Sequence, residues 1–260
     1  MTSIADAVND LAGTPRPVVC IDTCIFLDIL ISVRRDNTQI LEHTQKILQT
    51  IATAPDRLQI VITSLIRIEW MQKHSDVLNK ETRQDLSDLD KRISTVHATW
   101  DSLGSPLPNR APKYHDPSLP ENLKSLAESL LSIAMELDED PDCIRRALDR
   151  VKTKTRPSQG GAIKDSIHIE HFLELSRRLA ARGFTEPRVF VSSNTSDFSL
   201  DSSKAGILHP DLVGDLSTAG LEFFPSLGPA LRHVGLFGTR PAPAGGVPPA
   251  PPAGAPPTAP

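Results

Sequence analysis

Residues 18–30, VVCIDTCIFLDIL, constrain the fold more than any other stretch of the chain. They begin as a continuous apolar run of strand length, the pattern of a strand that is covered on both faces, as in a parallel sheet. From Ile25 onward the apolar residues recur at helical spacing instead. The change of period falls at Asp22. It predicts a carboxylate at the carboxyl end of a strand, where open α/β sheets keep their ligand crevice.

Three further segments have the composition of buried strands. LQIVIT, at residues 58–63, follows a helical stripe, so that strand, helix and strand together predict a βαβ crossover and parallel pairing. RVFVS at 188–192 and LEFF at 221–224 predict two more strands. We therefore predict an α/β fold, a Rossmann-like open parallel sheet of four to five strands flanked by helices.

Composition divides the chain into a main domain with attachments. The 260 residues, 39% of them hydrophobic, suffice for one substantial core, which we assign to residues 17–240. Residues 1–16 predict a loose N-terminal arm or a short edge helix. Between about residues 71 and 157 the strand signal vanishes, which predicts an all-helical insertion. Residues 241–260 are uncharged and contain nine Pro, six Ala and three Gly, so we expect a disordered or polyproline-like tail.

Cysteine usage and hydropathy suggest the compartment. Cys20, Cys24 and Cys143 include no Cys-x-x-Cys pair and are interpreted as reduced thiols. The sequence has neither a secretory signal pattern nor an apolar run of membrane-spanning length, so we expect a cytoplasmic protein without membrane association. The formal net charge of -4 does not indicate a partner, because an acidic metal site can coexist with a locally basic groove.

Four acids fall at a strand end or in the opening turns of a helix: Asp22, Glu69, Asp165 and Asp197. Because parallel strands end at one rim of a sheet, we expect these carboxylates to converge. Such a cluster is unfavourable without cations. Hard oxygen donors without accompanying His or Cys favour Mg²⁺ or Mn²⁺ over zinc. Carboxylate-held ions of this kind usually serve phosphoryl chemistry.

The segments around these acids resemble the PIN-domain nucleases. The resemblance lies in CIDTCIFLDIL, TSLIRIEW, GAIKDSIHIEHFLEL and VFVSSNTSDF, which span about residues 17–235 in the right order, with the helical segment as an insertion. The chain looks most like the larger single-chain members. This similarity implies metal-dependent RNA cleavage, with Asp22, Glu69 and Asp165 as ligands of Mg²⁺ or Mn²⁺. It leaves open whether an antitoxin, another regulatory protein or a homo-oligomer is involved.

Two positions depart from the family pattern. Cys24 stands where the family often has Asn, which removes a polar group from the site. The fourth motif, SSNTSDF, offers Asn194 and a single Asp197, so the fourth ligand stays open between them, and Ser193 is a further candidate to coordinate or orient water. Thr23 is a candidate support for the site. For Lys164, a contact to phosphate and a plain exposed cation are both open.

Two alternatives to a nuclease belong to other functional classes, a phosphatase and a binding module. A phosphatase of the haloacid-dehalogenase type needs Asp-x-Asp after the first strand, and Asp22-Thr23-Cys24 lacks the second Asp. A catalytically silent RNA- or protein-binding module with the same fold stays open, because fold does not fix function. His168 and His171 lie three residues apart on one predicted helix, and we interpret them as surface histidines rather than metal ligands.

Overall fold

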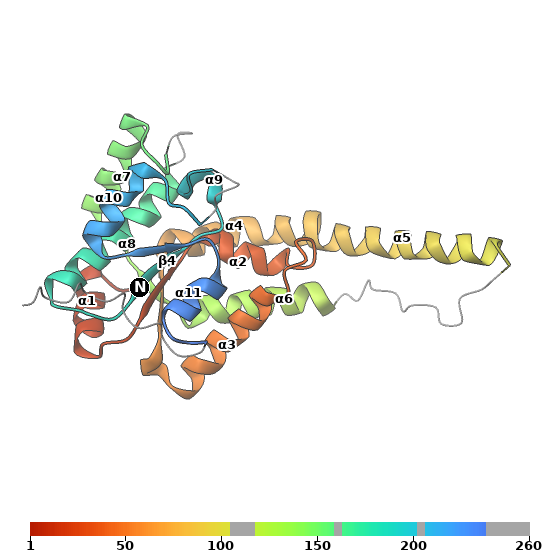
Figure 1. Ribbon diagram of the computed structural model, residues 1–260, viewed down its shortest axis with the longest axis horizontal. Helices are drawn as coiled ribbons and strands as arrows, with labels where there is room; N and C mark the ends of the chain where they lie inside the picture. The colour runs from red at the N-terminus through yellow and green to blue at the C-terminus, as the bar shows by residue number, and fades with distance from the viewer. Residues whose placement is uncertain (105–117, 159–162, 202–205, 238–260) are drawn as a thin grey trace, which may run out of the picture.

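The computed structural model describes residues 1–104, 118–158, 163–201 and 206–237. In this part of the chain five parallel strands form one sheet in the order β3-β2-β1-β4-β5 (Figure 1). Their bounds are β1 Val18–Ile21, β2 Gln59–Thr63, β3 Met135–Leu137, β4 Arg188–Val191 and β5 Glu222–Phe224. The predicted α/β class with an open parallel sheet is confirmed. The strand order reverses between β1 and β4, which is where such sheets bind ligands.

Helices cover both faces of the sheet (Figure 1). One group packs together over one face: α2 Thr23–Leu30, α3 Gln39–Thr53, α4 Ser64–Val77, α6 Ser118–Ser132 and α11 Leu227–His233. The other face carries α1 Ile4–Gly13, α7 Pro141–Thr153, α8 Lys164–Ala181 and α10 Pro210–Ala219. Two short elements, η1 Pro55–Arg57 and α9 Thr195–Phe198, precede β2 and follow β4. This double cover explains why the strands read as continuous apolar runs.

The central strand β1 is the most completely enclosed. Each of its four residues is at most 1% exposed, and it pairs in parallel with β2 on one side and β4 on the other. Val19 lies opposite Ile60 and Val189 in the two neighbours. Both faces of β1 are therefore core, and the chain emerges from it directly at Asp22.

The edge strand β3 was not predicted. It lies inside the segment for which we expected only helices, so that expectation is wrong at Met135–Leu137. Three residues are too few to show a periodic pattern, and this strand is specified by its register with β2, in which Ile62 lies opposite Glu136. The remaining described residues of this segment are largely helical, as predicted.

Of the two alternatives predicted for residues 1–16, a loose arm or a short edge helix, the structure has the helix, α1. Ile4, Ala7, Val8 and Leu11 are buried and form an i, i+3, i+4, i+7 stripe. Ahead of α1, the Thr2 amide donates to the Glu136 carbonyl at 2.8 Å, which extends the sheet beyond β3. The first residues thus cover the edge that β3 would otherwise expose.

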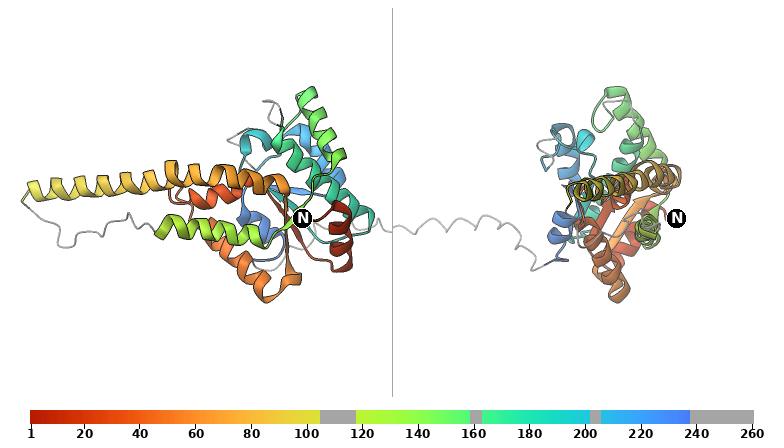
Figure 2. Two further views of the ribbon diagram at one scale, coloured as in Figure 1. Left: turned by 180° about the vertical axis from the view of Figure 1, so that it is seen from behind. Right: turned by 90° about the vertical axis from the view of Figure 1, so that its right-hand side faces the viewer.

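One helix leaves the body of the molecule. The helix α4 continues through the π-helical turn η2, Leu78–Thr82, into α5, Arg83–Ser102, which extends away from the sheet (Figures 1 and 2). Among the described residues, no helix is long and apolar enough to cross a membrane. The predicted tail at 241–260 lies outside the described residues.

Candidate active site

Asp22 lies at the switch point of the sheet. It follows β1 and caps α2, accepting a hydrogen bond from the Thr23 amide at 2.7 Å through Oδ1. Its other oxygen, Oδ2, accepts from the Ser192 hydroxyl, at the end of the neighbouring β4, at 2.6 Å. The Asp22 residue is only 3% exposed. One carboxylate therefore joins the ends of the two strands between which the strand order reverses.

Cys24 belongs to this network, so our expectation that it removes a polar group from the site is wrong. Its Sγ lies 3.3 Å from Asp22 Oδ2 and accepts from the Ser193 amide at 3.1 Å. Burial and the charge of Asp22 raise the pKa of the Cys24 thiol well above its ordinary value. The thiol stays protonated and serves Asp22 as a weak donor.

Glu69, on α4, is the most heavily hydrogen-bonded of the acids. Its Oε2 accepts from the Thr23 hydroxyl at 2.5 Å and lies 3.3 Å from His168 Nε2, while Lys73 and Lys164 each lie 3.3 Å from Oε1. Burial alone would raise the pKa of Glu69. The bonds from His168 and Thr23, with nearby positive charge, outweigh burial and hold the pKa well below its usual range. Glu69 is therefore a fixed anion.

Asp165 and Asp197 share a single amide. Asn194 Nδ2 donates to Asp165 Oδ2 at 3.1 Å and to Asp197 Oδ2 at 2.8 Å. The structure thus uses both residues of the SSNTSDF motif that we had left as alternatives. Arg156 Nη1 also approaches Asp197 Oδ1 at 3.2 Å and contacts the Ser196 carbonyl. Sequence reasoning missed Arg156, although it ends the basic run that precedes α8.

Shared hydrogen-bond partners link the four predicted acids: Thr23 contacts Asp22 and Glu69, Ser192 contacts Asp22 and Asn194, and Asn194 contacts Asp165 and Asp197. Burial raises the pKa of Asp165 to about 7, and the charges of Asp22, Asp197 and Glu69 add to that shift against the opposing effect of His168. Because the unfolded pKa is near 3.8, this carboxyl lowers the stability of the metal-free fold as the pH rises from about 4 to about 7. The acids converge at one rim, at an electrostatic cost that a cation would offset.

The donor set suits a hard divalent cation. Asp22, Asp165 and Asp197 offer carboxylate oxygens, and Asn194 and Ser192 offer further oxygen donors. As the side chains stand, no three His, Cys, Asp or Glu groups within the described residues are arranged to hold one ion. The carboxylates hydrogen-bond instead to Thr23, Ser192 and Asn194. The chemistry of the donors and the raised pKa of Asp165 therefore fit a cation, and binding one requires these local bonds to rearrange.

The two histidines of α8 are buried, so our interpretation of them as surface residues is wrong. His168 has no exposed surface, and its Nδ1 lies 2.7 Å from the Thr63 hydroxyl at the end of β2. It orients Glu69 through its other nitrogen. His171 is 1% exposed and faces α7, where its Nε2 accepts from the Asp140 amide at 2.9 Å. His168 therefore supports the acidic cluster, and His171 joins two helices.

Two basic residues close in sequence to the acids make different contacts. Lys164, the predicted candidate, lies 3.3 Å from Glu69. Arg67 pairs with Glu136 at 2.6 Å instead. Ser193, a candidate for the site, contacts Cys24 through its amide and hydrogen-bonds Asp28, whose pKa burial raises despite that bond. Asp28 lies on α2, six residues after Asp22.

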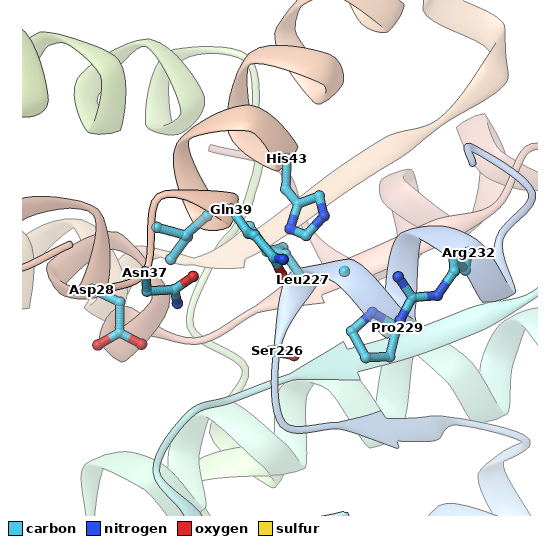
Figure 3. Close-up of a pocket in the computed structure, with 10 residues that line it drawn as sticks. Asp28, Asn37, Gln39, His43, Ser226, Leu227, Pro229 and Arg232 are labelled. Carbon is cyan, nitrogen blue, oxygen red and sulfur yellow. The ribbon is translucent and has the colours of Figure 1, made fainter. Parts of the chain in front are cut away.

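A cavity of about 210 Å³ lies beside Asp28, which Ser193 links to the end of β4, and none of the four clustered acids lines it. Figure 3 shows Gln39 and His43 of α3 on one side and Pro229 and Arg232 of α11 on the other, with Asn37 beside Asp28. Burial and the charge of Arg232 lower the pKa of His43, which places those two groups close together. Asn37, Gln39 and Arg232 make no side-chain hydrogen bond or ion pair to another described residue. The cavity therefore offers amide and guanidinium groups to a ligand.

Comparison with known proteins agrees with this geometry. A family model described as PIN domain matches residues 19–198, well over half of the chain and a span that contains all four clustered acids. Neither the curated proteins nor the solved structures yielded a match. Members of the matched family are generally nucleases and typically use divalent metals. With its parallel sheet and its acids at the switch point, the chain belongs to the PIN-domain family.

Proposed function

We propose that this protein is a metal-dependent endoribonuclease that hydrolyses RNA phosphodiester bonds at Asp22, Glu69, Asp165 and Asp197. The observation that carries the proposal is the charge cluster around Asp165. That carboxyl has a pKa of about 7 because it is buried beside Asp22, Asp197 and Glu69. Buried carboxylates placed this close together destabilise the metal-free fold. Such clusters are typical of functional sites.

Asp22, Asp165 and Asp197 would hold Mg²⁺ or Mn²⁺, with Glu69 beside them. When bound, the ion would supply activation of a water and stabilisation of the leaving oxygen. In the metal-free protein, hydrogen bonds from the chain's own groups hold the carboxylates near one another. Ser192 and the Thr23 amide hold Asp22, while Asn194 bridges Asp165 and Asp197. An ion would take the place of some of these donors, so its binding needs a local rearrangement of the carboxylates.

RNA as the substrate is supported by the groups around the cluster. Lys73 and Lys164 are about half exposed beside Glu69, with side-chain exposures of 47% and 44%, where they can meet phosphate. The cavity beside Asp28 adds the guanidinium of Arg232 and the amides of Asn37 and Gln39. Amides recognise base edges and the guanidinium recognises phosphate. We propose that a nucleotide next to the scissile bond occupies this cavity.

A cleavage assay on mixed single-stranded and structured RNAs tests the function. With Mn²⁺ or Mg²⁺ we expect the purified protein to produce internal cuts, and with EDTA we expect none. Heat-denatured protein with the same ions serves as the control for metal-driven RNA hydrolysis. If neither ion supports cleavage of any RNA while the protein is folded, the nuclease proposal fails and the silent binding module remains.

The same assay tests the cavity. Arg232→Met removes one charge and is expected to raise KM about five- to tenfold with kcat unchanged, the pattern of a lost binding contact. Arg57→Met is the matched control, because Arg57 is exposed in η1 before β2, at the opposite rim. Equal KM values for the two variants would remove the cavity from the substrate path and leave the acidic cluster untouched.

A further inference from the structure

The apolar residues in the outer part of α5 are not buried by any of the residues that the structure describes. Its base is anchored, since Leu86 is 3% exposed and ion pairs join Arg34 to Asp85 and Arg83 to Glu121. From residue 87 to residue 104 no residue is buried, and Figure 2 shows the helix standing clear of the body. A solitary helix of this length is marginally stable in water. Its persistence therefore suggests a partner.

The apolar residues of α5 follow a strict heptad. They alternate at spacings of three and four residues, which places them at successive a and d positions: Leu86, Leu89, Ile93, Val96, Trp100 and Leu103. This is the seam of a coiled coil rather than the broader stripe of a helix that packs on a sheet. Leu89, Val96 and Trp100 are 39%, 56% and 43% exposed. The seam is thus covered at Leu86 by the chain itself, and beyond Leu86 no described element buries it.

We propose that this seam pairs with the α5 helix of a second copy of the chain in an antiparallel coiled coil. One register aligns the exposed part of the seam with itself. It sets Leu89 against Trp100 and Ile93 against Val96, with an a position facing a d position in each layer, while Leu86 stays buried in its own chain. A two-fold axis between residues 94 and 95 repeats the two layers, as an isologous dimer requires.

The flanking charges favour the antiparallel orientation. In that register Asp90 lies beside His97 of the second copy and Arg92 beside Thr99, so no like charges meet. A parallel pair would set Asp85 against Asp90 and Arg92 against His97, which is unfavourable for the acids. The antiparallel pair also keeps the two bodies at opposite ends of a paired seam about 16 Å long. A second copy thus fits the surface in size and charge.

Sedimentation velocity of the full chain over about 1 to 100 µM tests the proposal, and it needs no catalytic activity. The parent is expected to approach dimer mass with rising concentration, because four layers form only a short coiled coil. Val96→Glu puts a charge in the seam and should weaken association at least tenfold, with unchanged circular dichroism. Thr95→Glu, on the outward face, is the matched control and should associate as the parent does. A parent that stays monomeric at about 100 µM, or a Val96→Glu variant that associates equally well, would overturn the proposal.

Disulfide trapping tests the orientation. Leu89→Cys and Trp100→Cys chains, mixed and oxidised, should form a mixed dimer, whereas neither variant alone should cross-link. The reason is that residue 89 faces residue 100 in the antiparallel register but lies about 16 Å from its own copy. The parent, which keeps the buried Cys20 and Cys143 and the partly exposed Cys24, is the control for cross-linking through native thiols. Efficient cross-linking of Leu89→Cys with itself would contradict the antiparallel arrangement.

Discussion

Replacing Asp165 with Asn is expected to lower RNA cleavage by orders of magnitude while leaving the metal-free protein at least as stable as the parent. Asn keeps the size of the side chain and can still accept from Asn194, so the local packing survives. It removes a negative charge from a buried cluster that contains Asp22 and Asp197. At pH 8 the gain should be about 1 to 2 kcal/mol, and it should fade as the pH falls below 7, because the parent's carboxyl then becomes protonated.

Melting curves at pH 8 and pH 5, beside the cleavage assay, check this result. Asp149→Asn is the control, since Asp149 makes only an exposed pair with Lys152 and should alter neither quantity. A structural aspartate predicts the reverse pattern. In that case Asp165→Asn would lose about 1 to 3 kcal/mol, and cleavage would fall only in proportion to unfolding. That outcome would show that Asp165 has a structural role and takes no direct part in the reaction.

Glu170→Gln should give the opposite combination, a large loss of stability without a loss of chemistry. Glu170 is 2% exposed on α8 and accepts from Arg146 Nε at 2.8 Å and Arg150 Nε at 2.6 Å. Removing its charge leaves the buried Arg150 guanidinium with only Asp215 as an anionic partner. Loss of one member of a buried ion pair costs about 3 to 5 kcal/mol. The residue faces α7, away from the acids, so the folded fraction should keep its kcat.

Urea unfolding measures this effect directly. Glu128→Gln is the comparison, because its pair with Lys124 is exposed and spans 3.7 Å, and it should change the free energy of unfolding by less than about 0.5 kcal/mol. If Glu170→Gln cost no more than Glu128→Gln, the ion pairs between α7 and α8 would not stabilise the fold. A fall in kcat of the folded fraction would instead show that the ion pairs between α7 and α8 influence the active site.

The sheet was predictable wherever a strand is long enough to leave a pattern. The strands β1, β2 and β4 read as apolar runs because both of their faces are covered. The edge strand β3 has three residues and depends on its neighbours for its structure, so no local rule detects it. For residues 1–16 the sequence left a loose arm and a short edge helix open, and the stripe of Ile4, Val8 and Leu11 in α1 favours the helix.

The acids were predictable because topology alone brings strand ends to one rim. Their supporting residues were harder to find. His168 lies one turn after Asp165, so the shared helix face could have indicated its burial. Arg156 approaches Asp197 from a loop, and Cys24 meets Ser193 across two strands. Such contacts depend on tertiary packing, which residue spacing does not encode.

The central claim, that the clustered acids hold a divalent cation, is tested most directly by melting the parent and Asp22→Asn at increasing Mn²⁺ or Mg²⁺. A ligand that binds only the folded state adds about 2.7 kcal/mol at one hundred times its Kd. For a domain of this size that corresponds to an increase in Tm of several degrees. We predict such a rise for the parent and a much smaller one for Asp22→Asn. Equal shifts in the two proteins, or no shift in the parent, would contradict the account.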